Sequence, residues 1–200
     1  MNSLNVWSKD SAKWLDEFCF KDRFTDAEEF IISEIKKLPR DIKILDYGCG
    51  TGRFIEILKK EIPDYDINNY LGIDTSENMI NLAKEKHENI NFDLANLDDL
   101  ACDNFDIVVC LDVLQHQNDP ISFLDKLLSI NSTKIFIEFW TKKDAQNLDN
   151  SKKVITLDST KEKFFENIYS HETLEELASL FNLKYMIFYN QINDIALLYI

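Results

Sequence analysis

The sequence of 200 residues has no apolar run long enough to cross a lipid bilayer. Its first ten residues, MNSLNVWSKD, lack the basic and apolar regions of a secretory signal peptide. These two absences predict a cytoplasmic protein that does not act in a membrane. The length favours a single domain with a sizeable buried core.

Basic residues are also scarce, since 22 Lys and Arg stand against 36 Asp and Glu, for a formal net charge of −14. Proteins that bind nucleic acid need a basic face to meet the phosphates. Here the lysines occur in short, scattered pairs such as IKK, LKK, TKK and SKK, which are typical of a solvated surface. The composition therefore predicts no nucleic-acid partner and favours a small-molecule substrate.

The four cysteines form no C-x-x-C pair. Without an export signal, disulfides are not expected. Cys49 lies in a glycine-containing loop and Cys110 in an apolar run. Both are predicted to be small buried residues rather than nucleophiles.

Glycine is equally scarce, with only four in the chain, and three of them stand in the segment ILDYGCGTGRF. Gly48, Gly50 and Gly52 follow an apolar run and alternate with single residues. Glycines in such a loop let the backbone approach a ligand or adopt a turn that a Cβ would not tolerate. The loop is the first candidate for a binding site.

The hydrophobic pattern alternates between predicted strands and helices. Helices are predicted at residues 8–20, 26–38, 53–62, 76–86, 119–130 and 171–181. Strands are predicted at 43–48, 69–74, 90–95, 105–114, 133–140, 184–191 and 195–200. Apolar strands that alternate with helices indicate a parallel sheet covered on both faces. The last two strands predict an antiparallel hairpin, which gives an α/β fold with six parallel strands and one antiparallel strand.

The glycine loop does not match the common nucleotide motifs. It reads G-x-G-x-G, whereas the dinucleotide fingerprint is G-x-G-x-x-G, and G-x-x-x-x-G-K-[ST] is absent. Asp46, just before the loop, would repel a pyrophosphate but suit an ammonium group. Asp74 ends the next strand, where an acid accepts hydrogen bonds from ribose hydroxyls. Together they describe a ligand with a ribose, a cationic end and no phosphate, which S-adenosylmethionine fits and a nicotinamide dinucleotide does not.

The segments ILDYGCGTGRF, YLGIDTSENMINLAKEK and FDIVVCLDVLQHQNDP resemble successive signature blocks of the class I S-adenosylmethionine-dependent methyltransferases. The likeness is greatest to the small-molecule group of that superfamily. It implies a Rossmann-like fold, a single methyltransferase domain over residues 1–200, and S-adenosylhomocysteine as the product. Within the domain, residues 1–38 would cover the cofactor, 39–140 would bind it, and 171–200 would form the terminal helix and hairpin. The polar residues 141–170 would form a substrate lid, with a plain mobile loop as the alternative.

The resemblance also implies roles for individual residues. Asp46 would hold the methionine ammonium, and the backbone at Gly48, Cys49 and Gly50 would pass close to the cofactor. Asp74 would accept from the ribose. The adenine would lie against Thr75, Met79, Asn96 and Leu97. Asn96 would accept a hydrogen bond from the adenine amine, with Asp98 as the alternative acceptor. Leu111 and Asp112 would lie near the sulfonium.

The methyl acceptor is less well defined by the sequence. The amine-specific pattern [DN]-P-P-[YFW] is absent after the fourth strand, where CLDVLQH stands instead. His116 in this segment is a candidate general base, although a structural role is the alternative. Candidate substrate contacts, which could equally be packing or capping residues, are Glu138, Trp140, Tyr169 and His171. Trp7 and Trp14 are candidates to roof the site.

The sequence thus predicts a methyltransferase that acts on a small molecule, with oxygen favoured over nitrogen as the acceptor atom. The acid-rich stretch DLANLDDLACDNFD is interpreted as solvated, so no metal is predicted. The main alternative is a domain that keeps the cofactor site but has lost catalysis and acts as a partner or regulator. Either a monomer or a homodimer is compatible with the pattern.

Overall fold

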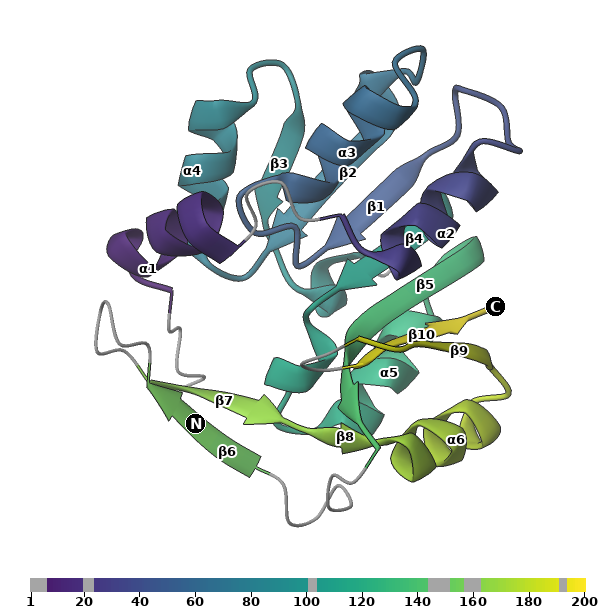
Figure 1. The fold of residues 1–200 in the computed structure, drawn as a ribbon. Helices are drawn as coiled ribbons and strands as arrows, with labels where there is room; N and C mark the ends of the chain where they lie inside the picture. The colour runs from purple at the N-terminus through teal and green to yellow at the C-terminus, as the bar shows by residue number, and fades with distance from the viewer. Residues whose placement is uncertain (1–6, 20–23, 101–103, 144–151, 157–162, 191–193) are drawn as a thin grey trace.

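The computed structural model describes residues 7–19, 24–100, 104–143, 152–156, 163–190 and 194–200. Its centre is a twisted sheet in the order β3-β2-β1-β4-β5-β10-β9 (Figure 1). The strands are β1 (Ile44–Tyr47), β2 (Tyr70–Asp74), β3 (Asn91–Leu94), β4 (Asn104–Leu111), β5 (Asn131–Lys142), β9 (Lys184–Phe188) and β10 (Asp194–Tyr199). Among these seven strands, β10 alone runs in the direction opposite to the other six. The predicted α/β fold with six parallel strands and one antiparallel strand is confirmed.

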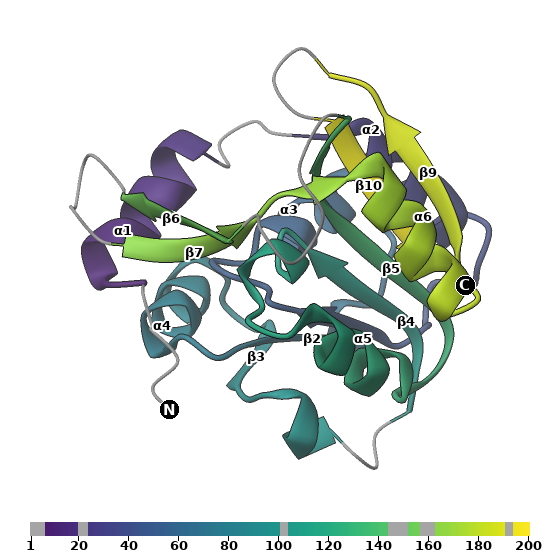
Figure 2. The same ribbon diagram turned by 90° about the horizontal axis from the view of Figure 1, so that it is seen from below.

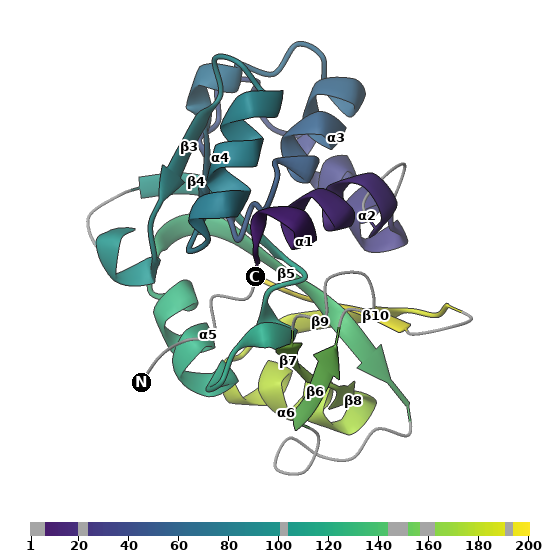
Figure 3. The same ribbon diagram turned by 90° about the vertical axis from the view of Figure 1, so that its left-hand side faces the viewer.

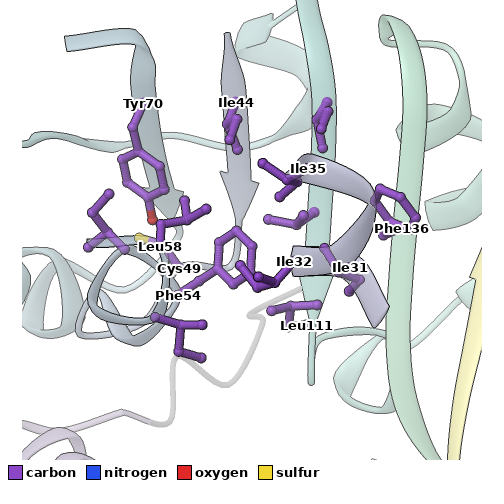
Figure 4. Packing of buried hydrophobic residues seen from close by; sticks show 14 of the residues in the cluster. Ile31, Ile32, Ile35, Ile44, Cys49, Phe54, Leu58, Tyr70, Leu111 and Phe136 are labelled. Carbon is purple, nitrogen blue, oxygen red and sulfur yellow. The ribbon is translucent and has the colours of Figure 1, made fainter. Parts of the chain in front are cut away.

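Helices cover both faces of the sheet, as Figure 2 shows. On one face lie α2 (Asp26–Ile35), α3 (Arg53–Glu61) and α4 (Glu77–Lys86), and on the other α5 (Pro120–Leu128) and α6 (His171–Leu180). In Figure 4, Ile35 of α2 lies toward Ile44 of β1, and Ile31 of the same helix lies near Leu111 of β4 and Phe136 of β5. All four residues of β1 are buried, because a strand in the middle of a parallel sheet is covered from both sides.

Local signals in the sequence account for the helix boundaries. Ser76 caps α4 by accepting a hydrogen bond from the Met79 N–H. Thr25 and Glu28 form a capping box that begins α2. This helix ends at Ile35 rather than at residue 38, because the Lys37 and Leu38 N–H groups donate to carbonyls three residues back and so tighten the chain into a turn before Pro39.

Two segments differ from the sequence prediction. The helix expected at residues 8–20 is α1 (Lys9–Trp14) followed by a π-helical turn, η1 (Leu15–Cys19), because hydrophobic spacing does not distinguish these helix types. The stretch 141–170 contains β6 (Lys152–Thr156), β7 (Lys163–Asn167) and the two-residue β8 (Tyr169–Ser170). β6 and β7 pair into a separate antiparallel sheet outside the main one (Figure 3).

Some predicted segments lie partly outside the described residues, namely residues 144–151 and 157–162 of the predicted lid and residues 191–193 of the predicted hairpin. Cys49 and Cys110 are free and buried, as predicted. Of the helices that the structure describes, none has the length and apolar character needed to span a membrane.

Candidate functional site

The carboxyl ends of β1, β2, β4 and β5 open onto one cavity of about 1350 Å³. In an open α/β sheet this edge is where ligands bind. Nearly all the residues singled out in the sequence lie on its wall: Asp46, Gly48, Cys49, Gly50, Asp74, Thr75, Met79, Asn96, Leu97, Leu111, Asp112, His116 and Trp140. The sheet brings them together because neighbouring parallel strands end at the same edge.

The glycine loop forms the floor between β1 and α3. Gly48 and Gly50 have φ angles of 75° and 55°, in the left-handed region that favours glycine. A Cβ on Gly48 would lie 2.2 Å from Cγ2 of Val113, so the loop packs directly on the turn after β4. A Cβ on Gly50 would meet no atom within 4 Å, so the backbone there faces open space. These are the features of a loop that a ligand approaches closely.

Asp74 ends β2 beside this loop. Its Oδ2 accepts from the Gly50 N–H at 3.1 Å, and its Oδ1 accepts from the Ser76 N–H at 2.8 Å. Burial raises the pKa of Asp74, while the hydrogen bonds from Ser76 and Gly50 oppose that shift. The carboxylate thereby ties the glycine loop to the start of α4 and still lines the cavity.

Asp46, at the third position of β1, is 2% exposed and lines the same cavity. Its Oδ2 accepts from the Tyr70 hydroxyl at 2.5 Å. Burial raises the pKa of Asp46 to about 7, with the Tyr70 hydrogen bond and the charge of Arg53 acting in the opposite direction. A buried carboxylate of this kind favours a cationic ligand group.

The N-terminal elements contribute the opposite wall, through Trp7, Trp14 and Leu15. Asp16 of η1 accepts from the Thr51 hydroxyl of the glycine loop at 2.6 Å. The same carboxylate pairs with Lys86 of α4 at 2.5 Å. The covering segment is therefore fastened to the loop beneath it by polar contacts.

The turn after β4 carries the candidate base. Asp112 has a φ of 59°, unusual for a residue other than glycine, and its N–H donates to the Glu138 carbonyl at 3.0 Å. His116 follows in the 3₁₀ turn η4 (Leu114–His116) and meets Trp7 edge to face, with ring centroids 6.0 Å apart. Both Asp112 and His116 line the cavity.

The end of the cavity beyond β3 is bounded by Thr75, Met79, Asn96 and Leu97. The side-chain oxygen of Asn96 accepts from the Asp98 N–H at 2.8 Å, and so closes a local turn. Asp98 itself pairs with Lys126 at 2.7 Å. An adenine amine that donates to Asn96 would therefore use a side-chain oxygen that already accepts a hydrogen bond from Asp98.

Three residues predicted to contact substrate do not line the cavity. Tyr169 is fully buried in the core, and its hydroxyl donates to the Leu114 carbonyl at 3.0 Å. His171 begins α6, where its Nε2 lies 2.9 Å from Oδ2 of Asp194. Glu138 is fully buried behind the wall and accepts from the Thr25 hydroxyl at 3.4 Å. Tyr169 turns inward because β8 pairs with the end of β5 in a register that directs its ring into the core.

Sequence reasoning missed several residues of the site. Tyr70 is the first residue of β2, and its hydroxyl reaches Asp46 of the neighbouring strand, a contact that no motif in the sequence indicates. Thr51 and Asp16 lie 35 positions apart and carry no shared motif. Within the described part of the chain, no group of three or more His, Cys, Asp or Glu side chains is arranged to hold a metal ion.

Comparisons with known proteins agree with this geometry. A family model described as a methyltransferase domain matches residues 20–186. A ubiquinone/menaquinone biosynthesis C-methyltransferase of Campylobacter jejuni is 41% identical over 69 residues, 34% of this chain and 29% of that protein. A ubiquinone biosynthesis O-methyltransferase of Coxiella burnetii is 36% identical over 83 residues, 38% of this chain and 33% of that protein. These alignments thus span about a third or less of the relatives' lengths.

Solved structures share the fold over nearly the whole chain. A SAM-dependent methyltransferase from Aquifex aeolicus superposes with a TM-score of 0.65 at 18% identity, and the match covers 96% of this chain and 97% of the other. A plantazolicin methyltransferase in complex with S-adenosylhomocysteine gives 0.66 at 19% identity, over 96% and 88%.

Proposed function

The chain belongs to the methyltransferase domain family, with the class I S-adenosylmethionine-dependent fold, and we propose that it methylates a small molecule by using S-adenosylmethionine. The observation that carries the proposal is the convergence of Asp46, the glycine loop and Asp74 on one cavity. When bound, S-adenosylmethionine supplies an electrophilic methyl group on a sulfonium sulfur.

The residues of the cavity fit this cofactor. Asp46 is a buried carboxylate that would bind the methionine ammonium, because a low-dielectric site strengthens that charge pair. The open space at Gly50 leaves room for the ligand against the backbone. Asp74 would accept from the ribose hydroxyls, and its two backbone bonds hold it in place. Thr75 and Met79 would bound the adenine, and Leu111 and Asp112 the reacting end.

The work of the protein in this reaction is to align the acceptor and exclude water. Leu111 and Asp112 would hold the acceptor in line with the methyl group that the bound cofactor would supply, with the sulfur as leaving group. The cover that Asp16 fastens to Thr51 would keep water from this line of attack. Trp140, 36% exposed at the end of β5, would border the incoming acceptor.

We propose a hydroxyl oxygen as the acceptor atom, with His116 as the base that removes its proton. His116 lines the cavity in the turn that follows Asp112, close to the predicted reacting end. Among the relatives both carbon and oxygen methyltransferases occur, so the assignment rests on this histidine and on the missing amine signature. A base within reach typically contributes about 10²–10⁴ in rate.

The test is a transfer assay with methyl-labelled S-adenosylmethionine and a panel of phenols, amines, carboxylates and activated carbon acids. Label is expected in a hydroxyl compound. His116→Asn should lower turnover by about 10²-fold or more and leave S-adenosylhomocysteine affinity unchanged. Label that enters only a carbon acid would refute the oxygen assignment. If the cofactor binds but no member of a broad panel is methylated, the result would favour the alternative of a cofactor-binding domain that has lost catalysis.

A further inference from the structure

Tyr70 is a buried residue that reaches the cavity only through another side chain. It is 1% exposed and opens β2, two positions before the residue that pairs with Asp46 in the sheet. Its hydroxyl donates to Oδ2 of Asp46 at 2.5 Å, which is a short contact for an O–H donor and a carboxylate. In Figure 4 the Tyr70 ring lies between the strands and the glycine loop, beside Cys49 and Leu58.

The contact divides the Asp46 carboxylate between two environments. Oδ2 is held by Tyr70 in the protein interior, and Oδ1 makes no hydrogen bond to any of the described residues. Since Asp46 lines the cavity, Oδ1 is the atom left for a ligand. One hydroxyl thus fixes which oxygen faces inward and which is offered outward.

Other ionisable groups also surround Asp46 and influence its charge. They are Asp74 from β2, Arg53 from α3, Glu28 from α2 and the thiols of Cys49 and Cys110. Arg53 favours the anion but is itself paired with Glu28. The carboxylates oppose the anion, which leaves the Tyr70 hydroxyl as the donor that holds Asp46 directly.

We propose that Tyr70 is a positioning residue for cofactor binding, which orients Asp46 and keeps it anionic toward the ammonium end of the cofactor. The inference rests on the proposed function, because the proposed function assigns the ammonium group of the cofactor to Asp46. Tyr70 itself stays a donor throughout the neutral range, since burial and the Asp46 charge raise its pKa well above the usual value.

The proposal has a pH signature. Burial raises the pKa of Asp46 to about 7, so the anion that binds an ammonium group is lost as the pH falls through that value. Removing the Tyr70 hydroxyl removes an interaction that lowers the pKa of Asp46, and the midpoint moves to higher pH. The loss of affinity is therefore greatest in acid and shrinks in mildly alkaline buffer.

The experiment measures binding of S-adenosylhomocysteine by calorimetry between pH 6.0 and 8.5 for the native chain and for Tyr70→Phe. We expect about a tenfold loss near pH 6 that diminishes toward pH 8.5, since one pKa unit corresponds to a factor of ten. The second ligand is 5′-methylthioadenosine, which has the same adenosine and sulfur but no ammonium group. Its affinity should be the same for both proteins.

Tyr65→Phe is the matched control variant. Tyr65 is also a buried tyrosine of this core, but its hydroxyl donates to the Ile42 carbonyl at 3.2 Å. This variant should keep the native affinity and pH midpoint. Replacement of Tyr70 by 3-fluorotyrosine, a stronger hydrogen-bond donor of nearly the same shape, should move the pH midpoint of binding to lower pH. This replacement tests the proposal if Tyr70→Phe does not fold.

Two outcomes would overturn the proposal. One is an unchanged pH profile for S-adenosylhomocysteine in both Tyr70 variants. The other is an equal loss for 5′-methylthioadenosine in Tyr70→Phe, which would mean a general structural effect. Failure of the native chain to bind S-adenosylhomocysteine at any pH would instead refute the proposed function, so the two failures are distinguishable.

Discussion

The Gly50 N–H donates to the Asp74 carboxylate at 3.1 Å, and this bond joins the glycine loop to the end of the neighbouring strand. One acidic side chain therefore shapes the loop and faces the cavity at the same time. The arrangement explains how a loop with three glycines is held in one conformation despite its backbone freedom.

Asp74→Ala should weaken S-adenosylhomocysteine binding by about 10–100-fold, because a hydrogen bond to a charged group contributes about 1.5–3 kcal/mol. The loss combines the ribose contact with a less ordered loop. Calorimetry checks it. Asp93→Ala, an exposed acid on the adjacent strand β3, is the control and should bind normally. Unchanged affinity in Asp74→Ala would contradict the assignment of Asp74 as the acceptor for the ribose hydroxyls.

Gly48→Ala and Gly50→Ala should separate stability from binding. Both place alanine in left-handed backbone at a cost of about 1–2 kcal/mol. Gly48→Ala also drives a Cβ into Val113 and should lose about 1–3 kcal/mol more. Gly50→Ala meets open space in the folded chain, so it should fold better than Gly48→Ala but bind cofactor poorly. Urea unfolding and calorimetry measure the two effects, and equal stability of the two variants would contradict the packing of Gly48 on Val113.

Asp46→Asn should stabilise the protein in alkaline buffer while it abolishes tight cofactor binding. Burial raises the pKa of Asp46 in the folded chain from 3.8 to about 7. Between these two pKa values the folded protein holds a proton that the unfolded chain has lost, so this contribution to stability is lost progressively as the pH rises from about 4 to about 7. At pH 8 the variant should be about 1–3 kcal/mol more stable than the native chain, because it buries an amide instead of a charge. At pH 5.5, which lies about midway between the unfolded and folded pKa values, roughly half of this difference should remain. Chemical denaturation at both pH values tests this, and a destabilised variant at pH 8 would be the opposite result.

Asp16→Asn should speed the release of S-adenosylhomocysteine by about tenfold, since it weakens the contacts of the cover with Thr51 and Lys86. Stopped-flow fluorescence that follows Trp7 and Trp14 on the cavity wall would report the rate. Asp10→Asn, an exposed acid in the first turn of α1, is the matched control. The same release rate in both variants would show that the Asp16 contacts do not retain the cofactor.

The sequence was sufficient to predict the sheet and much of the cavity wall, for a physical reason. Apolar strands that alternate with helices leave few topologies, and parallel strands bring Asp46 and Asp74 to one edge whatever the details of packing. Tyr169 is a residue for which strand order did not predict the position of the side chain. Its position before α6 suggested the same edge, but successive side chains of a strand point to opposite faces, and the register of β8 directs it into the core.

Contacts between distant segments were also beyond the sequence pattern. The bond from Tyr70 to Asp46 depends on the direction of one side chain across two strands, and the Thr51–Asp16 bond depends on how η1 crosses the loop. The π-helical turn of η1 has no hydrophobic period of its own that would distinguish it from the helix before it. Such features follow from packing rather than from local propensity.

The most direct test of the account is calorimetric titration of the purified protein with S-adenosylhomocysteine at pH 8, with NAD as the control ligand. We expect S-adenosylhomocysteine to bind and NAD not to bind, and we expect Asp46→Asn to lose most of the affinity. Binding of NAD, or undiminished binding of S-adenosylhomocysteine by Asp46→Asn, would contradict the assignment of the glycine loop and of Asp46.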